Sequence, residues 1–213
     1  MQGSKAMQQH VLISGASGLI GSALSTHLAR LGFVVHALER DNPAARFNYS
    51  SASRQVALDH SISLSAVINL AGPSIADGRW TARRKQELLE SRVDLTTALA
   101  TALAAAPQPP ALFLSASAVG FYGESTLPLN EEAPAGDDYL ASLATRWEAA
   151  TAPARQVGIP TAHLRFGVVL STKGGVLGKL MLPFSLCVGG KLGDGHQPMS
   201  WIALPDVLNL LTR

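Results

Sequence analysis

The sequence predicts an α/β fold, a doubly wound parallel sheet with helices on both faces and therefore three layers. Short apolar segments of strand character alternate with segments whose apolar residues recur every three to four positions, as in βαβ units. The first apolar segment also runs directly into a glycine-rich turn that opens such a helix. A chain of 213 residues with 47% hydrophobic residues is long enough to bury a full core.

The pattern of the first half of the sequence predicts four strands and two helices. The elements expected there are, in order, a strand over 10–14, a helix over 19–30, strands over 33–38, 55–58 and 66–70, and a long helix from Thr81. The serine-rich connection between the last two strands is too short for a full helix, so we expect a loop. Thr81 is the predicted N-cap of the long helix, whose buried stripe is expected to be Leu88, Leu95, Leu99 and Leu103.

The second half predicts a strand over 111–115, a loop of about twenty residues, a helix over 139–156 and a strand over 161–170. The sequence is rich in glycine from Lys173 onward. Its apolar end would either pair with another chain or form part of a helix, and consists of Leu204, Val207, Leu208, Leu210 and Leu211.

The turn after the first strand has the pattern of a nucleotide-binding turn. Gly15 permits the tight turn, Gly18 allows close approach to a pyrophosphate, and Gly21 allows the helix to pack closely on the sheet. The first N–H groups of the helix would face the phosphates. The pattern therefore predicts a Rossmann-like dinucleotide site, with the Gly-x-x-Gly-x-x-Gly spacing of the short-chain dehydrogenase/reductase superfamily. The other turn residues assigned to this site are Ser17, Leu19 and Ile20.

The end of the second strand determines which dinucleotide is preferred, and here it carries Glu39 and Arg40. A carboxylate accepts hydrogen bonds from a free ribose 2′-hydroxyl, whereas a guanidinium pairs with a 2′-phosphate. We favour NADP, with NAD as the alternative, since Arg40 can also stack on the adenine while Glu39 turns to solvent or to Arg46. An ordinary exposed ion pair is the remaining interpretation of both residues.

Further motifs carry a closer resemblance. Asn69-Leu70-Ala71-Gly72 is similar to the Asn-x-Ala-Gly element of short-chain reductases. The motifs downstream are Arg79-Trp80, Lys85, Ser91-Arg92-Val93, residues 115–123, Trp147-Glu148, Leu164-Arg165, Gly174-Gly175 and Ser200-Trp201-Ile202. This series, over about residues 10–206, resembles the atypical extended short-chain reductases known as NAD(P)-dependent sugar epimerase-like proteins of the YfcH and SDR39U type.

The resemblance implies a dinucleotide-binding domain over 10–170 and a partial substrate lobe over 171–213. Because the related proteins continue further, we expect either a fragment or a reduced substrate lobe. The remaining residues assigned to the cofactor are Leu70, Ala71, Gly72, Ser115 and Arg165. Arg165 would alternatively hold an anionic substrate or form a structural salt bridge.

The tyrosine and lysine that short-chain reductases use for proton transfer are not found at their usual spacing. Tyr139 is followed four residues later by Leu143, and a register aligned on Glu148 gives Leu140 and Ala144. A phenol without a cationic neighbour is a poor base at neutral pH. The candidate catalytic residues are therefore Ser117, at the end of a strand, and Tyr122, in the following loop.

We expect an NADP-dependent oxidoreductase or epimerase-like protein that acts on a nucleotide-sugar-like or other small carbonyl substrate. The alternative is a dinucleotide-binding protein without turnover, either a redox sensor or a partner-binding module. Oligomer formation stays open.

Composition excludes other classes. With a formal charge of +2 and scattered basic residues, we expect no nucleic-acid partner. No apolar run is long enough for a membrane, so the expected location is cytoplasmic. The six histidines have no metal-ligand spacing, so no metal site is expected. The single cysteine, Cys187, lies among apolar residues and is expected to be a buried thiol.

Overall fold

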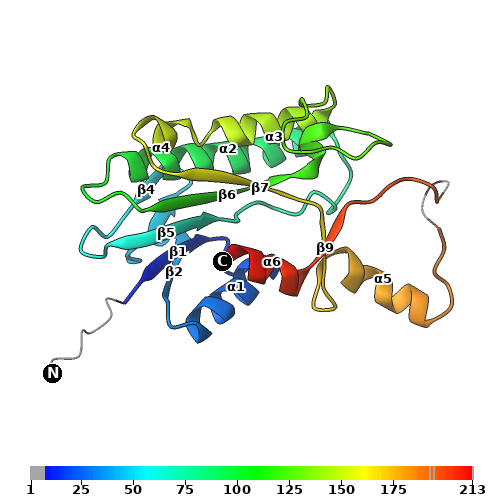
Figure 1. Ribbon diagram of the computed structural model, residues 1–213, viewed down its shortest axis with the longest axis horizontal. Helices are drawn as coiled ribbons and strands as arrows, with labels where there is room; N and C mark the ends of the chain where they lie inside the picture. The colour runs from blue at the N-terminus through cyan, green and yellow to red at the C-terminus, as the bar shows by residue number, and fades with distance from the viewer. Residues whose placement is uncertain (1–7, 192, 194, 213) are drawn as a thin grey trace. The chain divides into compact units, whose positions relative to one another are not determined.

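The computed structural model describes residues 8–191, 193 and 195–212 (Figure 1). It divides into two compact units. The first unit consists of Met1–Ala116 and Arg146–His163, and the second of Ser117–Thr145 and Leu164–Arg213.

The main sheet has seven strands in the order β4-β3-β2-β1-β5-β6-β7. Their bounds are β1 His10–Ser14, β2 Val34–Arg40, β3 Asn48–Ser50, β4 Gln55–Ala57, β5 Leu64–Asn69, β6 Leu112–Ala118 and β7 Thr161–Phe166. β1 pairs in parallel with β2 and β5, and β5 pairs in parallel with β6, so the predicted doubly wound α/β fold is confirmed. The edge pair β3–β4 is antiparallel, which corrects the expectation of a wholly parallel sheet. β3 was not predicted, because three residues are too few to display an alternating pattern.

The helices of the first unit lie on both faces of this sheet. α1, Leu19–Arg30, lies on one face, while α2, Ala82–Ala104, and α4, Ala152–Gln156, lie on the other (Figure 1). The Thr81 hydroxyl accepts a hydrogen bond from the Arg84 N–H, so the predicted N-cap of α2 is confirmed. The connection between β4 and β5 is a loop, as predicted.

The helix predicted over 139–156 is two helices, α3, Tyr139–Ala149, and α4. The Thr151 hydroxyl donates to the Glu148 carbonyl at 2.7 Å, and Pro153 lies in the first turn of α4. Proline has no N–H to continue the hydrogen-bond ladder of the preceding helix, so the helix is interrupted there.

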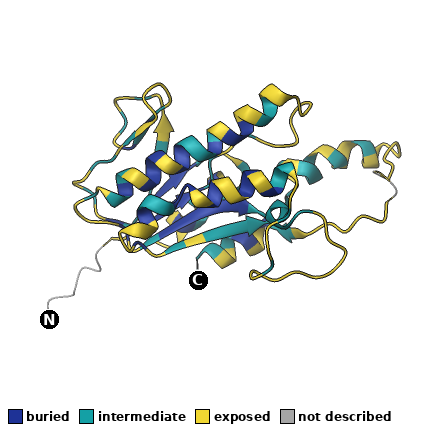
Figure 2. Cartoon of the chain, turned by 90° about the horizontal axis from the view of Figure 1, so that it is seen from above, coloured by how far each residue is buried: buried dark blue, intermediate teal, exposed yellow. Residues whose placement is uncertain are grey.

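The core of the first unit lies between the central strands and α2. Leu12 of β1, Val67 of β5 and Phe113 of β6 are fully buried and pack in one cluster with Leu99 and Leu103 of α2. Figure 2 shows these strands as the buried interior, with exposed residues on the outer faces of the helices. The predicted stripe of α2 is confirmed, since its four leucines are all buried.

The second unit contains a two-stranded parallel sheet of β8, Val168–Leu170, and β9, Trp201–Ala203. The predicted strand 161–170 is therefore divided at Gly167, where a Cβ atom would lie 2.6 Å from the Ser200 carbonyl oxygen. α5, Gly175–Ser185, was missed because its segment is rich in glycine. Within the segment 171–213, residues 192, 194 and 213 lie outside the described part.

The apolar end of the chain forms α6, Leu204–Leu211, which buries Leu204 and Val207. The helix alternative is therefore the one observed, although Leu210 is exposed.

Cys187 is exposed, so the expectation of a buried thiol is wrong. It follows α5, none of whose residues is buried, and its apolar neighbours Leu186 and Val188 are exposed as well. Among the described helices, none has both the length and the apolar character of a membrane span. The described residues also contain no cluster of three or more His, Cys, Asp or Glu side chains arranged to hold a metal ion.

Candidate functional site

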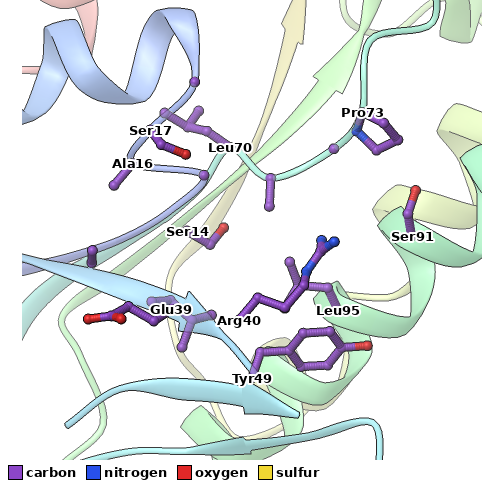
Figure 3. A pocket seen from close by; sticks show the side chains of 16 residues that line it. Ser14, Ala16, Ser17, Glu39, Arg40, Tyr49, Leu70, Pro73, Ser91 and Leu95 are labelled. Carbon is purple, nitrogen blue, oxygen red and sulfur yellow. The ribbon is translucent and has the colours of Figure 1, made fainter. Parts of the chain in front are cut away.

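A cleft of about 660 Å³ opens in the first unit where β1, β2 and β5 end (Figure 3). Cavities of this size hold cofactor-sized ligands. The described residues that line it are Ser14, Gly15, Ala16, Ser17, Gly18, Ala37, Leu38, Glu39, Arg40, Tyr49, Leu70, Ala71, Gly72, Pro73, Ser91 and Leu95. Most of them lie at or directly after the carboxyl ends of parallel strands, where ligands bind in doubly wound sheets, and Ser91 and Leu95 come from the helix α2.

The glycine turn between β1 and α1 forms one wall of this cleft. Gly15 has a φ of +72°, and a Cβ atom there would lie 2.9 Å from the backbone of Leu70 and Ala71. A Cβ on Gly21 would overlap the Gly15 carbonyl oxygen, and the Gly18 N–H donates to that same oxygen at 3.0 Å. Only glycine therefore fits at positions 15 and 21 without displacing the backbone.

The start of α1 offers backbone donors beside this turn. Gly18 is the N-cap residue and has no side chain to occupy the first N–H groups of the helix. These groups have no partner within a helix, and they carry the positive end of the helix dipole.

The end of β2 directs a cation into the cleft. Figure 3 shows the Arg40 guanidinium pointing into the cleft, while the Glu39 carboxylate points the opposite way. Glu39 accepts a hydrogen bond of 2.7 Å from the Asn42 amide. Arg46, the expected alternative partner of Glu39, instead lies 3.8 Å from Asp59. The two neighbouring residues at the strand end thus have separate environments.

Tyr49 of β3 lies beside Arg40 in the same cleft (Figure 3). Its side chain is buried, and burial raises the pKa of its phenol above the usual range. The ring therefore adds a neutral aromatic surface next to the guanidinium.

Beneath the cleft, a buried hydrogen-bond network holds the strand ends together. Asn69 at the end of β5 is fully buried, and its side-chain oxygen accepts from the Ser14 hydroxyl of β1. Its amide group donates to Thr96 of α2 at 2.8 Å and to Ser115 of β6 at 3.2 Å. The Trp147 indole donates to the same Thr96 hydroxyl at 3.0 Å. One amide therefore fixes three strands and one helix relative to one another.

The loop after β5 rests on a buried arginine. Arg92 of α2 donates to the Pro73 carbonyl at 2.7 Å and to the Leu88 carbonyl at 3.1 Å, and its guanidinium lies over the Trp147 ring. A Cβ atom on Gly72 would lie 3.1 Å from the Arg92 guanidinium carbon. Because residue 72 is a glycine, the loop after β5 can pack directly against the Arg92 side chain.

The structure brings most of the predicted cofactor residues together. Those that line the cleft are Gly15, Ser17, Gly18, Glu39, Arg40, Leu70, Ala71 and Gly72. Five other assigned residues are not among the described lining residues, namely Leu19, Ile20, Gly21, Ser115 and Arg165. The first three lie in the opening turn of α1, and Ser115 is buried in the Asn69 network.

Sequence reasoning missed the other eight described lining residues, which are Ser14, Ala16, Ala37, Leu38, Tyr49, Pro73, Ser91 and Leu95. Ser91 and Leu95 are four residues apart on α2 and therefore share a face. Tyr49 follows from the parallel register of β3, which places it opposite Arg40. No sequence pattern revealed that register.

Tyr122 and Arg165 meet within the second unit. Arg165 donates from Nη1 to the Tyr122 hydroxyl oxygen at 2.8 Å and to the Glu131 carbonyl at 3.3 Å. Its guanidinium carbon lies 3.5 Å from the centre of the Phe121 ring. Ser117, the other candidate catalytic residue, is buried at the end of β6.

The positions at which a short-chain reductase has its lysine are occupied by core residues. Leu143 and Ala144 of α3 are both buried. Leu140 packs against the turn at Gly120, where a Cβ would lie 3.2 Å from the leucine side chain. At positions 140, 143 and 144, α3 therefore carries side chains that pack in the protein interior or against the turn at Gly120.

The family model described as "NAD dependent epimerase/dehydratase family" matches residues 11–213. The chain belongs to this family. Epimerase family protein Mb2239 of Mycobacterium bovis is 40% identical over 204 residues, which are 94% of this chain and 67% of the relative.

Two solved structures resemble this family member over nearly its whole length. The human epimerase family protein SDR39U1, isoform 2, crystallised with NADPH, has a TM-score of 0.81 and 34% identity. The match covers 96% of this chain and 69% of the human one. The nucleoside-diphosphate sugar epimerase from Corynebacterium glutamicum has a TM-score of 0.80 and 38% identity, and the match covers 96% of this chain and 43% of that one.

Proposed function

We propose that the cleft of the first unit binds NADP(H), with Arg40 pairing with the 2′-phosphate. The observation that carries the proposal is the direction of the Arg40 guanidinium into the cleft, while Glu39 points away to Asn42 (Figure 3). A guanidinium forms charge-assisted hydrogen bonds to a phosphate. The human relative that was crystallised with NADPH supports the assignment.

The glycine turn fits the rest of the dinucleotide. Gly15 and Gly21 let the turn pack closely against backbone, and Gly18 lines the cleft without a side chain. The first N–H groups of α1 would donate to a pyrophosphate. Tyr49 offers its ring to the adenosine end beside Arg40. When bound, the cofactor supplies a hydride to, or accepts one from, a substrate carbon.

We propose that the protein is an NADP-dependent oxidoreductase or epimerase-like enzyme for a small carbonyl or sugar-derived substrate. Tyr122 is the proposed proton donor, since Arg165 holds its oxygen at 2.8 Å. Ser117 is the proposed second hydroxyl of the site. The occupation of the lysine positions by Leu143 and Ala144 favours the second candidate, a dinucleotide-binding protein without turnover.

Calorimetric titration with NADPH and NADH tests the cofactor assignment. Loss of a charge-assisted hydrogen bond costs about 1.5–3 kcal/mol, so Arg40→Ala is expected to weaken NADPH binding by about 10- to 150-fold. NADH binding should change little. Arg30→Ala, at the exposed end of α1, is the matched control for loss of one positive charge. Equal losses for the two dinucleotides in Arg40→Ala would contradict the assignment of the 2′-phosphate.

NADPH oxidation in the presence of a panel of carbonyl compounds separates the two candidate functions. An enzyme should turn over at least one compound, and Tyr122→Phe should lower kcat without weakening NADPH binding. Tight NADPH binding without turnover on any compound would favour the non-catalytic candidate.

A further inference from the structure

The second unit contains a pocket of its own, of about 1200 Å³. Its walls are the turn Val119–Tyr122, the loop 123–129 and the segment around Gln197, Pro198 and Ser200. We propose that this pocket binds an uncharged compound with an apolar body and a carbonyl or hydroxyl oxygen, and that it does not bind a nucleoside diphosphate sugar. The proposal that the pocket binds such a compound does not depend on the proposed function. The further statement that such compounds are the substrates of the protein rests on the proposed function.

Close backbone contacts build the walls of this pocket. A Cβ atom on Gly136 would lie 2.8 Å from the Gly123 backbone, and the Gly136 N–H donates to the Phe121 carbonyl at 2.9 Å. On the other side, the Val168 N–H donates to the Ser200 carbonyl at 2.8 Å. Segments distant in sequence are therefore fixed around the cavity by backbone contacts.

Tyr122 presents a hydrogen-bond donor to the pocket. A guanidinium can only donate, so the Tyr122 oxygen must be the acceptor of the 2.8 Å bond from Arg165. The phenol proton cannot lie along that bond and must point in another direction. Because Tyr122 lines the pocket, its O–H is available to an acceptor oxygen on a ligand.

The charge of the lining does not suit a pyrophosphate. The described lining residues include an acidic side chain, Glu124, and none of them is a lysine or an arginine. The nearby Arg165 is stacked on Phe121 and bonded to Tyr122 and to the Glu131 carbonyl. A pyrophosphate in this pocket would therefore meet a like charge and no cation among the described lining residues.

Apolar side chains complete the recognition surface. Leu127 is 73% exposed and Leu129 is 46% exposed, and both line the pocket together with Pro128 and Pro198. Apolar side chains gathered around a few polar groups are typical of small-molecule sites. The same lining also includes the Thr126 hydroxyl, a further polar group.

Ligand-observed NMR and calorimetric titration of the full chain, with and without NADPH, test the proposal. The probes are 4-phenylcyclohexanone, which has an apolar body and one ketone, and UDP-glucose. We expect saturable ketone binding that Tyr122→Phe weakens by about tenfold, the equivalent of one hydrogen bond. Tyr139→Phe, a tyrosine outside the described lining, is the matched control and should leave ketone binding unchanged.

A second variant tests the charge argument separately. Leu127→Lys adds a cation at an exposed position, so it should lower ketone affinity and create measurable UDP-glucose binding. The proposal is overturned if the ketone does not bind, if Tyr122→Phe leaves its affinity unchanged, or if UDP-glucose binds the unmodified chain and competes with the ketone. Failure of NADPH to bind in the separate titration would overturn the proposed cofactor and leave the ketone result intact.

Discussion

Gly15 and Gly32 both have positive φ, but only Gly15 lies against another segment of backbone. Their φ values are +72° and +92°, and a Cβ at Gly32 would meet nothing within 4 Å. A Cβ at Gly15 would lie 2.9 Å from three backbone atoms of Leu70 and Ala71. The pair of alanine substitutions therefore separates conformational strain from a steric clash.

The expected losses of stability follow from this difference. A side chain in the left-handed region costs about 1–2 kcal/mol, so Gly32→Ala should lower the free energy of unfolding by that amount. Gly15→Ala should lose the same amount plus about 1–3 kcal/mol for displacing the backbone after β5. In a chain of this size, each kcal/mol corresponds to about 2–4 °C in Tm.

Thermal and urea denaturation measure both variants, and NADPH titration supplies a second readout. Gly15→Ala should also weaken NADPH binding, since the displaced loop lines the cleft, while Gly32→Ala should bind normally. Equal losses of stability in the two variants would refute the role of close packing at Gly15. Normal NADPH binding by a destabilised Gly15→Ala would refute the link between the loop and the cofactor site.

Three further outcomes are expected. Asn69→Ala removes an amide that is hydrogen-bonded to the buried hydroxyls of Ser14, Thr96 and Ser115, so urea denaturation should show a loss of about 3 kcal/mol. A loss of less than about 1 kcal/mol in the free energy of unfolding would contradict the role of the Asn69 hydrogen bonds in stability. Burial lowers the pKa of His36 below its usual 6.5, so the unfolded chain takes up the proton first and stability should fall as the pH drops through and below about 6.5. His36→Phe should flatten this part of a stability profile, and an unchanged slope would contradict the assignment. Cys187 is exposed, so one thiol should react with a disulfide reagent in the native protein at nearly the unfolded rate, whereas strong protection would contradict its position.

The sequence predicted the elements whose patterns are long and complete. β1 and α1 begin and end at the predicted residues, because an apolar strand, a glycine turn and a periodic helix follow one another without interruption. The predicted N-cap Thr81 and the loop between β4 and β5 are also observed. The eight predicted residues that line the cleft lie at or directly after the ends of β1, β2 and β5.

Local sequence patterns did not predict the elements whose bounds are determined by tertiary contacts. Gly167 divides the strand predicted over 161–170 because the Ser200 backbone passes against it, and no local pattern reports that approach. α5 forms in a segment whose glycines indicate a loop, and Cys187 is exposed because that helix has no buried face.

The alternation of side chains along β2 explains why the Glu39 and Arg40 side chains point in different directions. Consecutive side chains of a strand point in opposite directions, so when the Arg40 guanidinium points into the cleft, the Glu39 carboxylate points away from it, although Glu39 still forms part of the cleft wall. The register with β3 pairs Arg40 with Tyr49 and Glu39 with Asn48, and residues directly opposite each other share a face. Arg40 and Tyr49 are therefore brought to the cleft as a pair. A shift of one residue in β2 would instead place Glu39 opposite Tyr49, and a carboxylate suits a free ribose hydroxyl better than a phosphate. If Arg40 pairs with the 2′-phosphate as proposed, the cofactor preference thus depends on strand register as much as on the identity of residue 40.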